Sequence, residues 1–114
     1  MEERDFGTTG LRVPVVGMGT WRTFDVYGKE EQAARTDLVT HALRLGVRFF
    51  DSSPMYGEAE RVLGAGLTGR RNRAIVATKV WTPDPIEGYA QIDRALHYFE
   101  DRIDIYQVHN LVRW

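Results

Sequence analysis

The sequence predicts a single α/β domain built around a parallel β-sheet. Short apolar segments of strand type alternate with amphipathic helical segments over most of the 114 residues. The connections between them are short, as in right-handed parallel crossovers. The chain is 43% hydrophobic and 27% charged, an ordinary globular composition that allows a buried core.

A β-hairpin is predicted at the start of the chain. Two extended runs, residues 4–6 and 11–16, flank the sequence GTTG, whose glycines supply turn geometry. The apolar run at 15–18 then predicts the first strand of the main sheet. This strand leads into a tight loop at Gly19, Thr20 and Trp21.

Three helices and three further strands are predicted in alternation. Helical stripes at 31–45 and 59–67 give the first two helices, and the first ends at Gly46. The stripe of the first helix consists of Ala34, Leu38, Ala42 and Leu45, with Val39 and Leu43 beside it. Asp84 and Pro85 supply an N-cap and a first helical residue for the third helix. The further strands are expected at 47–51, 74–79 and 103–109, with a loop at 111–114.

Charge and composition exclude several classes of function. The net charge of −1 gives no support for binding to nucleic acid or to an anionic membrane. The absence of cysteine excludes disulfide and thiolate chemistry. The three histidines are too dispersed for a local zinc pattern, so no metal site is expected. A neutral small molecule or a protein is the expected partner.

Targeting signals are also missing from the sequence. The charged start "MEERD" does not resemble a signal peptide, and no apolar run is long enough to span a bilayer. We therefore expect a cytoplasmic protein. The pair Arg70 and Arg71 is expected to lie in a solvated turn.

Strand parity brings ionisable side chains to one end of the predicted sheet. Alternate residues of a strand share a face, and the apolar rows of three strands end in Asp51, Lys79 and His109. Ligands of parallel α/β folds gather beyond the carboxyl ends of the strands. Tyr56 lies in the loop that follows Asp51. We expect these four side chains to converge on one pocket.

The predicted set of side chains suits the reduction of a carbonyl group. When a hydride reaches the carbonyl carbon, the oxygen becomes alkoxide-like and takes a proton from a positioned acid. Tyr56 is expected to be this acid, with its pKa lowered by the nearby Lys79 ammonium. Asp51 is expected to pair with Lys79, and His109 to place the carbonyl oxygen through a hydrogen bond.

Each of the four residues also has an ordinary structural interpretation when it is taken alone. An aspartate before Ser-Ser-Pro is typical of a turn or cap, and a tyrosine is often half-buried with its hydroxyl at the surface. A strand-end lysine usually extends to solvent, and an isolated histidine is often a hydrogen-bonded core residue. The shared rim of the sheet favours the functional interpretation.

The glycines of "GMGT" do not complete a dinucleotide-binding motif. The G-x-G-x-x-G pattern starting at Gly17 requires a third glycine where Arg22 stands. The sequence therefore does not predict a Rossmann fold.

Four segments resemble the N-terminal part of an aldo-keto reductase. "GMGTW" at 17–21, "FFDSSPMYG" at 49–57, "ATKVW" at 77–81 and "IYQVHN" at 105–110 are similar to that family's first four strand-end motifs, in order. The resemblance implies a (β/α)₈ TIM barrel closed at its bottom by the N-terminal hairpin. It also implies the reversible, NADPH-dependent reduction of aldehydes or ketones. The catalytic tetrad it implies consists of Asp51, Tyr56, Lys79 and His109, with Tyr56 as acid and base.

The resemblance further implies residues that contact the cofactor and the substrate. The loop residues Gly19 and Thr20, with Trp21 beside them, would lie against the nicotinamide end of NADPH, and Asp51 would be a further neighbour of the cofactor. Trp21 and Trp81 would line the pocket for a small carbonyl substrate. From the residues alone, both tryptophans are equally well explained as structural aromatics that cover the rim of the barrel.

The length of the chain limits what it can form alone. A complete barrel of this type needs about 250 residues, so residues 1–114 are expected to form its N-terminal half. The resemblance places most cofactor contacts on strands five to eight, and the isolated chain is therefore expected to be incomplete for activity. Open edges at the first and fourth strands are expected to promote self-association.

A non-catalytic role is the alternative. Some members of the aldo-keto reductase family act chiefly as regulatory subunits bound to channel proteins. A half-barrel could also serve as a scaffold. The presence of all four tetrad residues favours chemistry. NADPH oxidation that depends on Tyr56 would separate these two functions.

Overall fold

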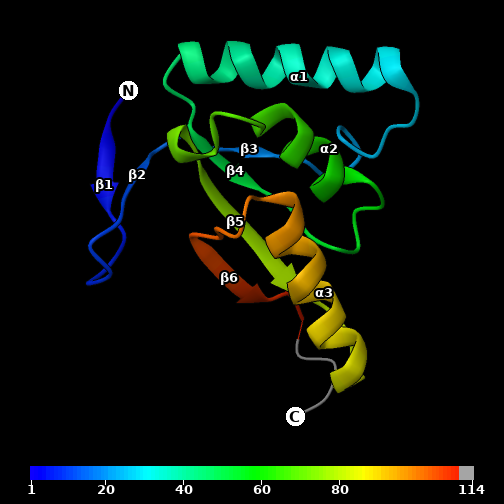
Figure 1. Ribbon diagram of the computed structural model, residues 1–114. Coiled ribbons are helices and arrows are strands. Elements are labelled where there is room, and N and C mark those ends of the chain that lie inside the picture. Colours follow the sequence, from blue (N-terminus) through cyan, green and yellow to red (C-terminus); the bar gives the residue numbers. More distant parts are fainter. Residues whose placement is uncertain (111–114) are drawn as a thin grey trace.

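Residues 1–110, which the computed structural model describes, form a four-stranded parallel sheet, three helices and a separate hairpin (Figure 1). The sheet has the order β3–β4–β5–β6, with strands at Met18–Gly19, Phe49–Asp51, Ile75–Val80 and Ile105–Val108. The helices are α1 (Lys29–Arg44), α2 (Ala59–Leu67) and α3 (Pro85–Tyr98). The predicted fold class and order of elements are confirmed. The loop predicted at 111–114 lies outside the described residues.

Three of the four strands, β3, β4 and β6, are paired over fewer residues than the apolar runs that predicted them, whereas β5 keeps its length and is displaced by one residue. The first strand was expected at 15–18, but β3 pairs with β4 only through Met18 and Gly19. Asp51 lies opposite Ala77, which in turn lies opposite Ile105. The ladder with the neighbouring strand, and not the apolar run, sets where each strand begins and ends.

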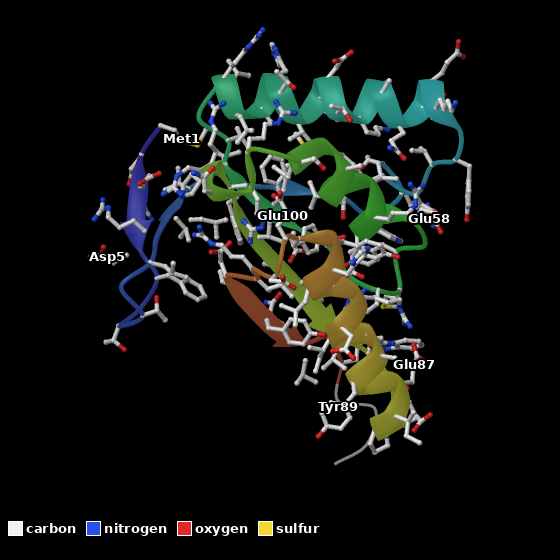
Figure 2. The ribbon with its side chains drawn as sticks, viewed as in Figure 1. Met1, Asp5, Glu58, Glu87, Tyr89 and Glu100 are labelled. Atoms are coloured by element: carbon white, nitrogen blue, oxygen red, sulfur yellow. The ribbon has the colours of Figure 1, made fainter. Side chains whose placement is uncertain are left out.

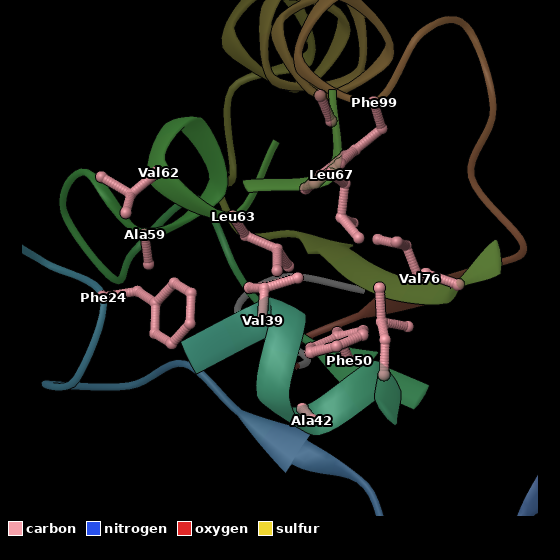
Figure 3. Close-up of a cluster of buried hydrophobic side chains, with 13 residues drawn as sticks. Phe24, Val39, Ala42, Phe50, Ala59, Val62, Leu63, Leu67, Val76 and Phe99 are labelled. Carbon is pink, nitrogen blue, oxygen red and sulfur yellow. The ribbon is translucent and has the colours of Figure 1, made fainter. Parts of the chain in front are cut away.

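The core lies between the helices and one face of the sheet (Figure 3). Phe50 and Val76 come from the sheet and are completely buried, and helix side chains such as Val39 and Leu63 join them in one cluster. The predicted stripe of α1 is partly wrong, since Leu38 and Leu45 are 39% and 62% exposed. The face of α1 that packs inward is instead the one centred on the residues Val39, Ala42 and Leu43.

Helix α3 begins as its sequence predicts. The Asp84 carboxylate accepts a hydrogen bond of 3.0 Å from the backbone N–H of Ile86, and Pro85 occupies the first helical position. Within residues 1–110, no helix combines the length and the apolar character needed to cross a membrane.

The hairpin is attached at the N-terminal end of the sheet. Its strands β1 (Glu3–Asp5) and β2 (Arg12–Pro14) pair in antiparallel fashion. Arg48, which directly precedes β4, places Nε 2.7 Å from Glu3 Oε1 and donates from Nη2 to the carbonyl of Arg12 at 2.9 Å. The hydrogen bond from Arg48 lowers the pKa of Glu3. The hairpin is therefore anchored at the end of the sheet opposite the carboxyl ends of the strands.

A buried ion pair ties two strands together at the same end of the sheet. Arg71 Nη2 lies 2.7 Å from Asp104 Oδ2, and both side chains are 5% exposed. Arg71 also donates to the backbone carbonyls of Ala74 and Arg102. The expectation of a solvated turn is therefore wrong for Arg71, because its guanidinium bridges the segments that enter β5 and β6.

Asp104 is held as a carboxylate by this network. Burial alone would raise its pKa, but the hydrogen bonds from Arg71 and from the Val76 N–H outweigh it, so the pKa of Asp104 is lowered. A folded-state pKa below the unfolded value stabilises the fold above the unfolded pKa. This contribution is lost as the pH falls through the folded-state pKa.

Arg71→Met is predicted to destabilise the fold strongly, because it removes the buried cation of Asp104 and leaves that carboxylate with only the half-exposed Arg102. Loss of one partner of a buried pair typically costs about 3–5 kcal/mol, which urea unfolding would measure. Arg73→Met is the matched control, because Arg73 is exposed in the same short helix (Arg71–Arg73) and is expected to change the free energy of unfolding by less than about 0.5 kcal/mol. If the two substitutions lower the free energy of unfolding equally, the buried Arg71–Asp104 ion pair is not the cause of the destabilisation.

Self-association is predicted to run through β6, which is an outer strand of the described sheet. Val108 lies on this strand and is 64% exposed. A lysine on an edge strand opposes pairing with another chain, so Val108→Lys should lower the mass measured by light scattering. Ile86→Lys is the control, since Ile86 is 80% exposed but lies on α3. If both variants lower the mass alike, edge pairing is not the cause.

Candidate functional site

The carboxyl ends of β4 and β5 are joined by an ion pair. Lys79 Nζ lies 2.8 Å from each carboxylate oxygen of Asp51 and donates to the backbone carbonyl of Ser52 at 2.6 Å. Lys79 is 8% exposed, whereas the Asp51 side chain is 38% exposed. The lysine thus lies inside and its carboxylate partner borders solvent.

Tyr56 lies against the same group of side chains. The centre of its ring is 5.5 Å from Lys79 Nζ and 5.7 Å from the centre of the His109 ring, and the two rings are nearly perpendicular at 88°. The loop after β4 brings Tyr56 there from a position five residues beyond Asp51. The structure therefore places the four side chains expected at the rim in one cluster.

His109 is fixed at the end of β6 by two contacts. Its backbone N–H donates to the carbonyl of Val80 at 3.0 Å, which extends the ladder with β5. Its Nδ1 lies 2.8 Å from the hydroxyl of Ser53, a completely buried residue. Burial lowers the pKa of His109, and the Lys79 charge lowers it further against the opposing effect of Asp51. The imidazole is therefore neutral at neutral pH.

The expected direction of the Tyr56 pKa shift is wrong. Burial raises the pKa of Tyr56 above its ordinary value, and the negative charge of Asp51 raises it further. The Lys79 ammonium does not reverse this shift, since Asp51 lies directly against it and compensates its charge. Tyr56 is therefore a fully protonated phenol at neutral pH.

The residues of the loop after β3 differ in how far they are exposed to solvent. Thr20 is completely buried, and its hydroxyl lies 3.0 Å from the Asp51 carbonyl and 2.9 Å from the Ser52 hydroxyl. Its side chain therefore supports the loop from inside and is not open to a ligand. Gly19 lies opposite Asp51 in the ladder, and a Cβ built on it would meet no atom within 4 Å. Open space therefore adjoins the backbone of Gly19.

Asp25 connects this loop to the one that carries Tyr56. Its Oδ1 accepts a 2.9 Å hydrogen bond from the backbone N–H of Glu58, and its carboxylate presses on Gly57. Gly57 has φ +59°, and a Cβ there would come within 2.2 Å of Asp25 Oδ1. The positive φ favours glycine at this position, and the hydrogen bond from Glu58 to Asp25 joins the two loops.

A small hollow opens beside Tyr56. Its volume is about 90 Å³, and it is lined by Trp21, Arg22, Asp25, Met55, Tyr56 and Gly57. Trp21 is 60% exposed and the Arg22 guanidinium lies 4.5 Å above its ring. Figure 2 shows that the hairpin, marked by Met1 and Asp5, lies across the molecule from Glu58, which closely follows Tyr56. The hollow is thus remote from the hairpin.

Trp81 is not among the described residues that line this hollow. It follows β5 and is 38% exposed. The Gln91 side chain bonds both to its backbone N–H at 2.8 Å and to its carbonyl at 3.0 Å. Trp81 is therefore held at the rim by its backbone, with its indole partly open to solvent.

Three residues that shape the site are missing from the sequence-based set: Ser53, Asp25 and Gln91. Ser53 had a usable signal, because a second small polar residue directly after a buried strand tends to be buried with a partner. Asp25 and Gln91 had none, since their partners lie far along the chain or on a different element.

Asp51→Asn is predicted to lower the pKa of Tyr56. The substitution removes the carboxylate that raises this pKa and leaves the Lys79 ammonium without its counter-ion. Ring ¹³C NMR of labelled tyrosines would follow the titration, with Tyr56→Phe to assign the signal. Asp37→Asn, at an exposed position of α1, should leave the pKa unchanged. An unchanged or higher pKa in Asp51→Asn would contradict the described electrostatics.

Comparison with solved structures extends the likeness from motifs to the fold. Aldo-keto reductase AKR11C1 from Bacillus halodurans, in its holo form, superposes with a TM-score of 0.78 at 26% identity over 95% of this chain and 40% of its own. An aldo-keto reductase from Klebsiella pneumoniae in complex with NADPH gives a TM-score of 0.74 at 24% identity, over 86% of this chain and 36% of its own.

Sequence comparison points to the same group of proteins. L-galactose dehydrogenase of Arabidopsis thaliana is 42% identical over 84 residues, which is 69% of this chain and 26% of that protein. The chain thus spans about a quarter of this curated relative and less than half of the matching structures. The sequence pattern of the Aldo/keto reductase family matches residues 15–114. The chain therefore belongs to the aldo/keto reductase family of oxidoreductases.

Proposed function

We propose that this chain supplies the catalytic half of an NADPH-dependent reductase that converts aldehydes or ketones to alcohols. In this proposal, residues 1–114 form the N-terminal half of a (β/α)₈ barrel, and further strands complete the cofactor site. The observation that carries the proposal is the cluster of Asp51, Tyr56, Lys79 and His109 at the carboxyl ends of the strands.

Tyr56 is the proton donor in this scheme. Its raised pKa keeps the phenol protonated at neutral pH, so the proton is in place when the carbonyl oxygen becomes alkoxide-like. The Lys79 ammonium, 5.5 Å from the centre of the ring, stabilises the phenolate that remains after transfer. Asp51 holds Lys79 charged and in position, and His109 places the carbonyl oxygen.

The residues beside Gly19 fit the nicotinamide end of the cofactor. The backbone of Gly19 borders open space, and the partly exposed Asp51 carboxylate lies next to it in the ladder. These two residues would hold the nicotinamide end, while the buried Thr20 would stiffen the loop beneath it. NADPH, when bound, supplies the hydride. Trp21 and Trp81 are exposed at the rim and would bound the carbonyl pocket.

The test is NADPH oxidation in a chimera. Residues 1–110 would replace the matching part of AKR11C1, which this chain covers at a TM-score of 0.78, so that the relative supplies the remaining strands. We expect the chimera to bind NADPH and to oxidise it with a reactive aldehyde. Tyr56→Phe should lower kcat about 10²–10⁴-fold, the usual contribution of a general acid, with NADPH binding retained.

Binding and turnover answer different parts of the proposal. A folded chimera that binds NADPH but reduces no aldehyde, or a Tyr56→Phe variant with full activity, would contradict the catalytic assignment. The 114-residue chain alone is the control and should show little change in NADPH fluorescence. Saturable binding by a monomeric chain would overturn the claim that further strands complete the cofactor site.

A further inference from the structure

We propose that Ser53 is a positioning residue that fixes the His109 imidazole in the tautomer with its proton on Nε2. The pair joins the loop after β4 to the end of β6 across 56 positions of sequence, with Ser53 Oγ 2.8 Å from His109 Nδ1. Ser53 is completely buried, so no solvent competes for its hydroxyl.

The direction of this hydrogen bond follows from the other contact of the hydroxyl. Ser53 Oγ already accepts from the backbone N–H of Met55, at 3.3 Å. If His109 Nδ1 carried a proton, the oxygen would accept twice and its own proton would have no described acceptor. A buried donor without a partner costs about 1–3 kcal/mol. The hydroxyl therefore donates to Nδ1, which must then be unprotonated.

The charges around the imidazole agree with this assignment. Lys79 and Asp51 lie nearby as an ion pair, and burial together with Lys79 lowers the pKa of His109. The neutral ring has one proton, and with Nδ1 accepting from Ser53 that proton is on Nε2. Among the described residues, Nε2 has no hydrogen-bond partner.

The functional meaning of this tautomer rests on the proposed carbonyl reduction. A carbonyl oxygen accepts hydrogen bonds and cannot donate them, so His109 can place it only through an N–H. The opposite tautomer would present a lone pair at Nε2 and would repel the oxygen. Ser53 would thus act on the substrate without touching it.

Imidazole ¹⁵N NMR of the 114-residue chain tests the proposal without requiring turnover. We expect the wild-type spectrum to show His109 with unprotonated Nδ1 and protonated Nε2, with His109→Gln to assign the signals among the three histidines. Ser53→Ala should shift the tautomer ratio toward Nδ1–H by roughly fivefold, the effect of one net hydrogen bond. Ser53→Thr, which keeps the hydroxyl, should retain the wild-type ratio.

Ser52→Ala is the matched control. Ser52 is an equally buried neighbour, but its hydroxyl contacts Thr20 and not His109, so its loss should leave the His109 signals unchanged. A wild-type spectrum with the proton on Nδ1 would overturn the proposal, as would a Ser53→Ala spectrum with an unchanged ratio. Failure of the chimera to reduce aldehydes, with the Nε2–H tautomer intact, would count against the proposed function and not against this inference.

Discussion

Lys79 carries its charge at a position that is only 8% exposed, and a buried charge is costly unless oxygens compensate it. The two carboxylate oxygens of Asp51 and the carbonyl of Ser52 provide that compensation. Meeting this requirement fixes the end of β4, the end of β5 and the first turn of the following loop relative to one another. Tyr56 and His109 then pack against this rim, so the positions of the phenol and the imidazole depend on the position of Lys79.

The two ends of the sheet serve different purposes. At the amino ends, Arg71 and Asp104 form an ion pair in which both side chains are 5% exposed, and Arg48 attaches the hairpin. At the carboxyl ends, the ion pair is asymmetric, with Asp51 38% exposed. A closed pair stabilises the fold, whereas a pair open on one side leaves a carboxylate at the surface where a ligand can meet it. The same chemistry is therefore structural at one end and suited to binding at the other.

Local patterns were sufficient to predict the sheet and the rim, since alternation along each strand is decided by neighbouring residues. Burial and protonation are harder to predict, because they depend on residues that are distant in the sequence. Arg71 was misjudged because its partner Asp104 is 33 positions away, and the Tyr56 pKa shift was reversed because its sign depends on burial and on which charge is already compensated. For Ser53 the sequence indicates burial with a partner, but not that the partner is His109, which β6 brings beside it from 56 positions away. Sequence thus predicted which groups gather at the rim but not their protonation.

The contact of Asp25 with Gly57 has a consequence for how this rim can diversify. An added methyl group at Gly57 would have to displace the Asp25 carboxylate, so a change in one loop affects the other. Met55 and Trp21 escape this coupling, being 44% and 60% exposed on the wall of the hollow. These two exposed side chains can therefore vary while the backbone beneath them stays constant.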